Sequence, residues 1–244
     1  MAGDFRQPAH LPNLREDRQP APPDRLPRQR AGVTPQLHGR YPDYNVLREA
    51  PHWDEVTRRL VLDRVENVPE IRFFTASEAS TLGAFCDAVL AQDKEPQVPV
   101  LNMVDAKLFG GQLDGFCYAD MPDDRETWRR VARGLDAAAR QHGVDEFATA
   151  PWHIQRGVIQ AFSEGELHGE VWDELPPKRA WTVVMRAVLS AFYSHPWAWN
   201  EIGFGGPAYP RGFARFGVGQ REHWEGAAAT DIDPVQDVSE RGIE

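Results

Sequence analysis

The sequence is poor in cysteine, with only Cys86 and Cys117 among its 244 residues. Two thiols are too few for a multi-disulfide framework or for a zinc site built from four cysteines. No stretch approaches the roughly 20 consecutive apolar residues that a transmembrane helix needs. The N-terminus also lacks the apolar core of a secretory signal. These shortages predict a globular chain without direct membrane insertion.

Positive charge is also in short supply, because 27 lysines and arginines stand against 37 acidic residues, for a net charge of -10. A nucleic-acid-binding protein needs a basic footprint, so this class of function is excluded. The charge is uneven along the chain. Residues 1–40 carry seven arginines against four acids, whereas residues 226–244 carry one arginine against five acids.

No segment alternates apolar and polar residues over more than a few positions, and no strand–helix–strand rhythm is present. Apolar residues instead recur at intervals of three and four, which is typical of helices. The sequence therefore predicts an all-α fold, an irregular bundle of five or six helices. The expected helices cover residues 52–65, 75–92, 99–109, 122–142, 151–162 and 176–192.

Domain organisation follows from composition. The first forty residues hold seven of the twenty prolines and have no apolar period. Such a segment buries too little surface to offset its ordering entropy. We expect an extended or disordered arm over residues 1–45, a helical domain over 46–216 and an acidic tail over 217–244.

Two helices show informative local signals. Thr75 and Glu78 have the spacing of a capping box that opens the second helix, and Cys86 falls on its inward face. In the first helix, the spacing places Trp53, Val56, Leu60 and Val61 on one apolar side.

The most unusual stretch, called here the aromatic segment, is residues 192–216. It holds eight of the chain's 25 aromatic residues, interleaved with glycine and proline. Glycine and proline disfavour regular structure, yet aromatic side chains favour burial. The segment is expected to pack on its own helices, to dock on another chain, or both.

The aromatic segment contains YSHP at 193–196 and WNEIGFGGPAYPRGF at 199–213, and an earlier helix opens with FTASEASTL at 74–82. Together these motifs resemble the gluconate 2-dehydrogenase subunit 3 family over about residues 72–216. The closing motif is specific because it is long and unusual in composition.

The resemblance implies a small helical subunit that binds a large FAD-dependent flavoprotein of the glucose-methanol-choline (GMC) type in a hetero-oligomer. The large chain would hold the FAD, oxidise a sugar, sugar acid or glycoside, and pass electrons to a cytochrome or another acceptor. Many relatives carry a twin-arginine signal, which residues 1–71 lack. The expected location is therefore the cytoplasm, and the periplasm only if the partner carries an export signal.

The resemblance and the composition of the aromatic segment together place partner docking there. The predicted docking residues are Tyr193, His195, Trp197, Trp199, Asn200, Ile202, Phe204, Pro207, Tyr209, Arg211 and Phe213. For Arg211 two contacts stay open: a partner's carboxylate or carbonyls, or an internal tie.

No catalytic, cofactor-binding or metal-binding residue is predicted in this chain. The glycine run at 203–207 follows no strand and opens no helix, as a phosphate loop would. The cluster of Glu164, Glu166, His168 and Glu170 is read as a solvated turn. FAD is expected only in the partner subunit.

The predicted function is a non-catalytic small subunit that stabilises the flavoprotein and helps to load its FAD. One alternative is a transient chaperone of the flavoprotein. A less favoured alternative is an autonomous helical enzyme using His195 and acids such as Glu201.

Overall fold

The computed structural model describes residues 41, 44–92, 97–112, 118–215, 217 and 220–227. These residues form helices and no β-strand, which confirms the predicted all-α class. In chain order the elements, with η marking 3-10 helices, are η3 (Val46–His52), α1 (Glu55–Glu66), α2 (Ala76–Val89), α3 (Val100–Phe109), α4 (Asp124–Gln141), η4 (Phe147–Thr149), α5 (Trp152–Glu164), α6 (Glu170–Asp173), α7 (Pro177–Tyr193) and α8 (Pro196–Ile202).

All six helices expected from the sequence are present, as α1 to α5 and α7. The elements that the periodicity did not reveal are the short ones: α6, α8, η3 and η4. An element of three to seven residues is too short to display a 3.6-residue period.

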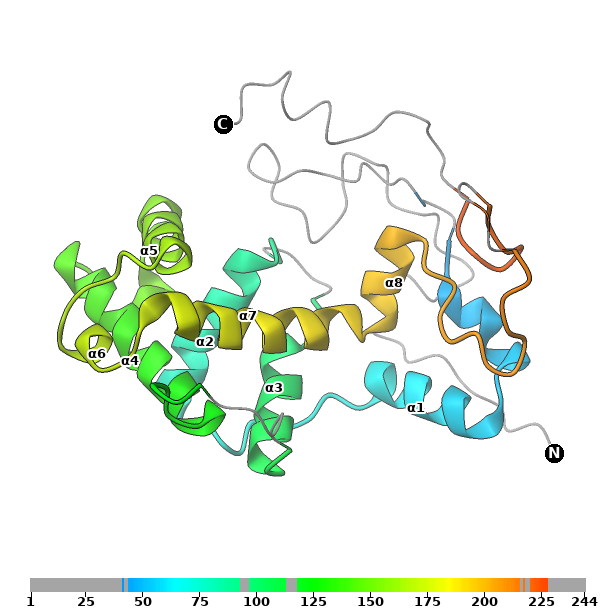
Figure 1. The fold of residues 1–244 in the computed structure, drawn as a ribbon, viewed down its shortest axis with the longest axis horizontal. Helices are drawn as coiled ribbons and strands as arrows, with labels where there is room; N and C mark the ends of the chain where they lie inside the picture. The colour runs from blue at the N-terminus through cyan, green and yellow to red at the C-terminus, as the bar shows by residue number, and fades with distance from the viewer. Residues whose placement is uncertain are drawn as a thin grey trace, which may run out of the picture. The chain divides into compact units, whose positions relative to one another are not determined.

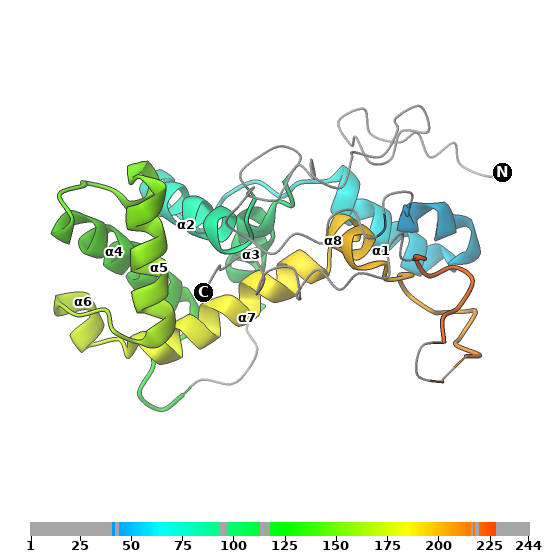
Figure 2. The same ribbon diagram turned by 90° about the horizontal axis from the view of Figure 1, so that it is seen from above.

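The chain divides into two compact units, both drawn in Figures 1 and 2. One unit contains η3, α1 and α8 with the segments that follow α8. The other contains α2 to α6, η4 and α7 as far as Phe192. The segment predicted as one helical domain, residues 46–216, is thus distributed over both units.

The second unit is organised around α2 and α4. Helix α2 packs against α3, α4, α5 and η4, and α4 also contacts α5 and α6. The ring of Phe162 on α5 lies 5.1 Å from that of Trp172 and 5.3 Å from that of Trp181, and it also contacts Phe85 of α2. Cys86 is a buried free thiol whose burial raises its pKa, whereas Cys117 lies outside the described residues.

The segment leading into α2 is held by one buried carboxylate. Asp105 on α3 accepts the backbone N–H groups of Arg72 (2.7 Å), Phe73 (3.0 Å) and Phe74 (2.9 Å). These amides lie outside any helix, so no helical hydrogen bond can satisfy them. Asp105 therefore fixes the path of the chain just before the Thr75–Glu78 capping box, which the structure confirms.

A second buried carboxylate acts in the same way. Asp136 on α4 accepts from the Thr81 hydroxyl of α2 (2.8 Å) and from the Phe147 backbone N–H of η4 (3.0 Å). The same three elements also pack against one another. One acidic side chain thus links α2, α4 and η4.

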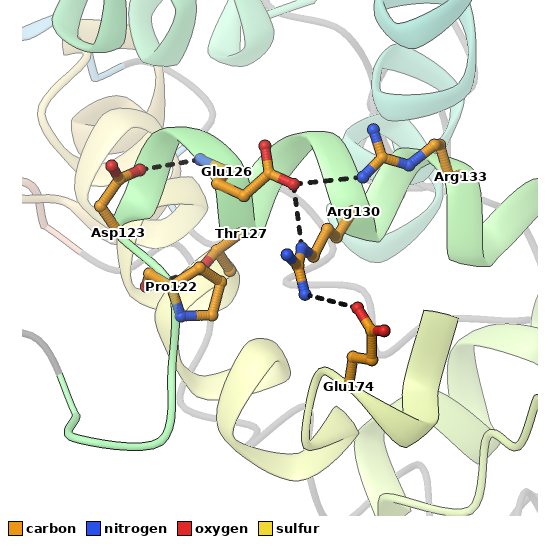
Figure 3. A network of polar contacts seen from close by, with 7 residues as sticks. All are labelled: Pro122, Asp123, Glu126, Thr127, Arg130, Arg133 and Glu174. Carbon is orange, nitrogen blue, oxygen red and sulfur yellow. Dashed lines mark hydrogen bonds and ion pairs between the residues drawn. The ribbon is translucent and has the colours of Figure 1, made fainter. Parts of the chain in front are cut away.

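The start of α4 carries a surface network that Figure 3 shows from close by. Asp123 caps the helix by accepting from the Glu126 backbone N–H (2.9 Å), while the Glu126 carboxylate accepts from Arg130 (2.9 Å) and Arg133 (3.2 Å). Arg130 also reaches Glu174, after α6. The hydrogen bond from Arg130, aided by Arg133, holds the pKa of Glu126 below its ordinary value.

In the first unit, one cluster of Val46, Trp53, Val61 and Trp199 forms the core, brought together from η3, α1 and α8. The predicted apolar side of α1 is wrong at two positions. Val56 and Leu60 are 66% and 55% exposed, whereas Val61 and Val65 are buried. Trp53 lies in the turn before α1 rather than in its first turn, so counting helical spacing from Trp53 selected the wrong face.

The Asp105 carboxylate can be tested by Asp105→Asn. The substitution places an NH₂ donor against amides that need acceptors, so we expect the free energy of unfolding to fall by about 2–3 kcal/mol. Urea denaturation followed by far-UV circular dichroism measures it. Asp123→Asn is the matched control, because asparagine caps a helix as well as aspartate. Equal stability of the two variants would contradict the role given to Asp105.

Candidate functional site

The aromatic segment begins with a helix, which corrects the prediction that glycine and proline keep it irregular. Pro196 occupies the first turn of α8, where a missing N–H costs nothing, and Gly203 ends the helix in the left-handed conformation (φ 68°). Proline and glycine therefore act here as start and stop signals. The sequence contained both signals, but α8 has only seven residues.

His195 caps α8. Its Nδ1 accepts the backbone N–H of Trp197 (3.2 Å), and its Nε2 lies 3.0 Å from the carbonyl oxygen of Arg64 on α1. These contacts assign the neutral ring with the proton on Nε2. With both ring nitrogens engaged and 1% of its surface exposed, His195 positions α8 on α1 and is not placed for proton transfer.

Trp199 and Asn200 join α8 to the rest of the unit. The Trp199 ring lies in the core cluster, and its indole N–H donates to the carbonyl of Tyr193 (2.6 Å). The Asn200 side-chain oxygen accepts the backbone N–H of Val46 (2.8 Å), which begins η3. This bond connects residues 154 positions apart in the sequence.

The glycine run is packed against the core rather than open to a ligand. Gly206 has φ +72°, and a Cβ atom there would lie 2.8 Å from the Trp53 ring and 3.0 Å from the Val46 side chain. The run also follows the C-terminal end of α8, where the helix dipole repels anions. The glycine run therefore serves the close packing of the chain on Trp53 and Val46.

Arg211 makes the internal tie, one of the two contacts left open by the sequence. Its guanidinium donates to Glu49 of η3 (2.6 Å) and lies 4.2 Å from the centre of the Trp224 ring. The pair is largely shielded from solvent. Arg211 therefore links the aromatic segment to η3 and to Trp224.

Sequence reasoning missed three residues that hold the aromatic segment. Tyr44 donates its hydroxyl to the carbonyl of Trp224 (2.8 Å), and burial, aided by Glu49, raises the pKa of this phenol well above its ordinary value. Trp224 is buried, although it falls in the predicted tail. The signal for Trp224 was a lone tryptophan in a polar stretch.

Glu222 is the third missed residue. Its carboxylate accepts the backbone N–H groups of Ala214 and Arg215 (2.5 and 2.6 Å), where the chain leaves the aromatic segment. Burial alone would raise the pKa of Glu222, but these two hydrogen bonds hold it below the ordinary value. Glu222 thus accepts hydrogen bonds from two backbone amides that lie outside any helix.

The predicted docking residues divide by exposure. His195, Trp197, Trp199 and Asn200 are buried within the chain, and Pro207 and Arg211 are half-buried. The other five predicted docking residues are exposed, whereas Phe216 of the aromatic segment lies outside the described residues. The exposed five are Tyr193, Ile202, Phe204, Tyr209 and Phe213.

Within the part of the chain that the structure describes, no three His, Cys, Asp or Glu residues are grouped to hold a metal ion. Glu164, Glu166, His168 and Glu170 are all exposed to solvent. In the described part of the chain, no helix is long and apolar enough to cross a bilayer.

The close packing of the glycine run can be tested by Gly206→Ala against Gly212→Ala. Both positions have positive φ, but a Cβ atom at Gly212 would meet nothing within 4 Å. We expect Gly212→Ala to lower the free energy of unfolding by about 1 kcal/mol through backbone strain. Gly206→Ala should lower it by about 2 kcal/mol more through overpacking. If urea denaturation gives the same decrease in the free energy of unfolding for both variants, the glycine run does not pack closely against Trp53.

Comparison with protein families matches residues 76–206 to the family described as gluconate 2-dehydrogenase subunit 3. The match covers more than half of the 244 residues, from the start of α2 to Gly206 of the aromatic segment. Searches of curated proteins and of solved structures find no match. The family match confirms the resemblance carried by the sequence motifs, and the chain belongs to the gluconate 2-dehydrogenase subunit 3 family.

Proposed function

We propose that this chain is a non-catalytic small subunit that binds and stabilises a GMC-type FAD-dependent dehydrogenase acting on a sugar, sugar acid or glycoside. The large subunit holds the FAD and carries out the oxidation, and this chain assists FAD loading. Family membership supports the subunit role. The partner that binds the exposed side chains of the aromatic segment is therefore a flavoprotein.

The observation that carries the proposal is the division within the aromatic segment. The segment is held by contacts of Asn200, Arg211 and Glu222, yet five of its large apolar side chains are 39–67% exposed. A rigid loop that presents exposed aromatic residues loses little entropy on binding. Aromatic residues are also enriched at the centres of interfaces.

The position of His195 argues against the alternative of an autonomous enzyme. A general base must reach the proton that it abstracts. His195 is buried, and its two nitrogens are engaged by Trp197 and Arg64. The residue that this alternative needs is instead part of the scaffold.

The proposal is tested by isolating the tagged chain from cytoplasmic and periplasmic fractions of its native host. We expect a larger chain in stoichiometric amount, with a flavin absorption spectrum that a sugar substrate bleaches. A flavoprotein present only in traces would favour the transient chaperone. A colourless chain eluting alone from both fractions would overturn the proposal.

The docking residues are tested by Tyr209→Ala, because Tyr209 is the most exposed of the five, at 67%. Removing an aromatic anchor should weaken binding of the flavoprotein by about 2 kcal/mol, or roughly 30-fold in Kd. Surface immobilisation of the chain and titration with the flavoprotein measures the change.

Val56→Ala is the control, because Val56 is equally exposed but lies on α1. Trp199→Ala and Arg211→Ala are poor probes of docking, since both side chains hold the fold. If Tyr209→Ala binds as tightly as Val56→Ala, the aromatic segment is not the docking surface.

A further inference from the structure

Three arginines gather around two phenylalanine rings in the unit built on α2 and α4. The guanidinium carbons of Arg125 and Arg129, both on α4, lie 5.0 and 4.5 Å from the centre of the Phe73 ring. Arg72, the neighbour of Phe73, lies 4.2 Å from the centre of the Phe109 ring. These five residues are called here the arginine cluster.

The arginine cluster is not neutralised by ion pairs. Among the residues that the structure describes, none of its three guanidinium groups forms an ion pair with a carboxylate. The neighbouring Arg130 and Arg133 on the same helix are paired with Glu126 (Figure 3). The same helix thus carries one pair of arginines with an acidic partner and one pair without.

One carboxyl group contacts the backbone of the cluster. The buried Asp105 accepts the backbone N–H groups of Arg72, Phe73 and Phe74, so its oxygens are occupied. It offers the guanidinium groups no direct partner. Glu78 is similarly engaged in the capping box of α2.

Keeping these positive charges together has a cost. Arg125 and Arg129 stand four residues apart on α4, a spacing at which like charges repel. Stacking on Phe73 offsets this repulsion, but it leaves the N–H groups of the guanidinium free to bind an acceptor. Each guanidinium carries five N–H donors. Toward the described residues, these two side chains form one hydrogen bond, from Arg129 to the Phe73 carbonyl.

We propose that the arginine cluster is a second docking surface, which binds a carboxylate-rich segment of the flavoprotein partner; this inference rests on the proposed function. Carboxylates match the forked geometry of the guanidinium donors. Phe109, 47% exposed beside Arg72, adds an apolar contact. Arginine with phenylalanine is the composition of a protein interface.

A nucleic acid is a poorer occupant than an acidic peptide. The chain has a net charge of -10, so most of the molecule repels a long polyanion. A short acidic segment can contact the three arginines of the cluster without extending over the rest of the molecule.

The first experiment uses the isolated full chain labelled with ¹⁵N-arginine and titrated with hexaglutamate at low ionic strength. We expect the Nε–Hε resonances of Arg72, Arg125 and Arg129 to shift saturably and to return at high salt. Those of the paired Arg130 and Arg133 should stay in place. The absence of localised shifts would overturn the proposal, whether or not a flavoprotein is found.

The second experiment measures the affinity of variants for the flavoprotein. Arg125→Glu should weaken binding about tenfold at low salt, and Arg125→Lys should weaken it less. An acid at this position lies in the first turn of α4, where the helix dipole favours it, so the fold is retained. Arg156→Glu, an exposed charge reversal on α5, is the matched control.

The two experiments separate this inference from the proposed function. Hexaglutamate binding without any co-purified flavoprotein would retain the acidic-segment site and remove the flavoprotein as its occupant. A flavoprotein that binds Arg125→Glu and Arg156→Glu equally well would keep the proposed function and overturn the second docking surface.

Discussion

Buried backbone amides outside helices must find acceptors, and this constraint shapes both units. Asp105 supplies acceptors for the segment before α2, and Asn200 supplies one for the start of η3. Glu222 supplies acceptors for two partly buried amides at the end of the aromatic segment. For a fully buried amide, such as that of Phe73 or Phe74, a missing acceptor would cost about 1–3 kcal/mol. Side-chain acceptors thus hold the irregular chain where no helical hydrogen bond is available.

The parts of the fold that rest on local signals could be predicted from the sequence. The start of α2 could be predicted from the capping box at Thr75, and both α2 and α4 show apolar spacing over several turns. The exposure of Val56 and Leu60 on α1 could not be predicted in this way, because the buried Val61 packs with Trp199 of α8, which lies far away in the sequence. Tertiary contacts therefore decided what helical periodicity left ambiguous.

Amino-acid composition pointed to the aromatic segment, but composition could not separate its buried residues from its exposed ones. Trp199 and Tyr209 are both aromatic residues in one glycine-rich stretch, yet Trp199 lies in the core and Tyr209 faces solvent. The difference arises from α8, which turns Trp199 toward Val46 and Trp53, and from its cap by His195. Nearby aromatic residues of one segment are therefore divided between the core and the surface.

The arginines are divided in a similar way, between those that form ion pairs within the chain and those that do not. Arg211 is matched with Glu49, and Arg130 with Glu126, so these arginines serve the fold. Arg125 and Arg129 contact an aromatic ring instead of an acid, which keeps their charge directed outward at little desolvation cost. In the docking that we propose, the stacked arginines attract an acidic segment of the partner at one place, and the exposed apolar side chains of the aromatic segment contact it at another.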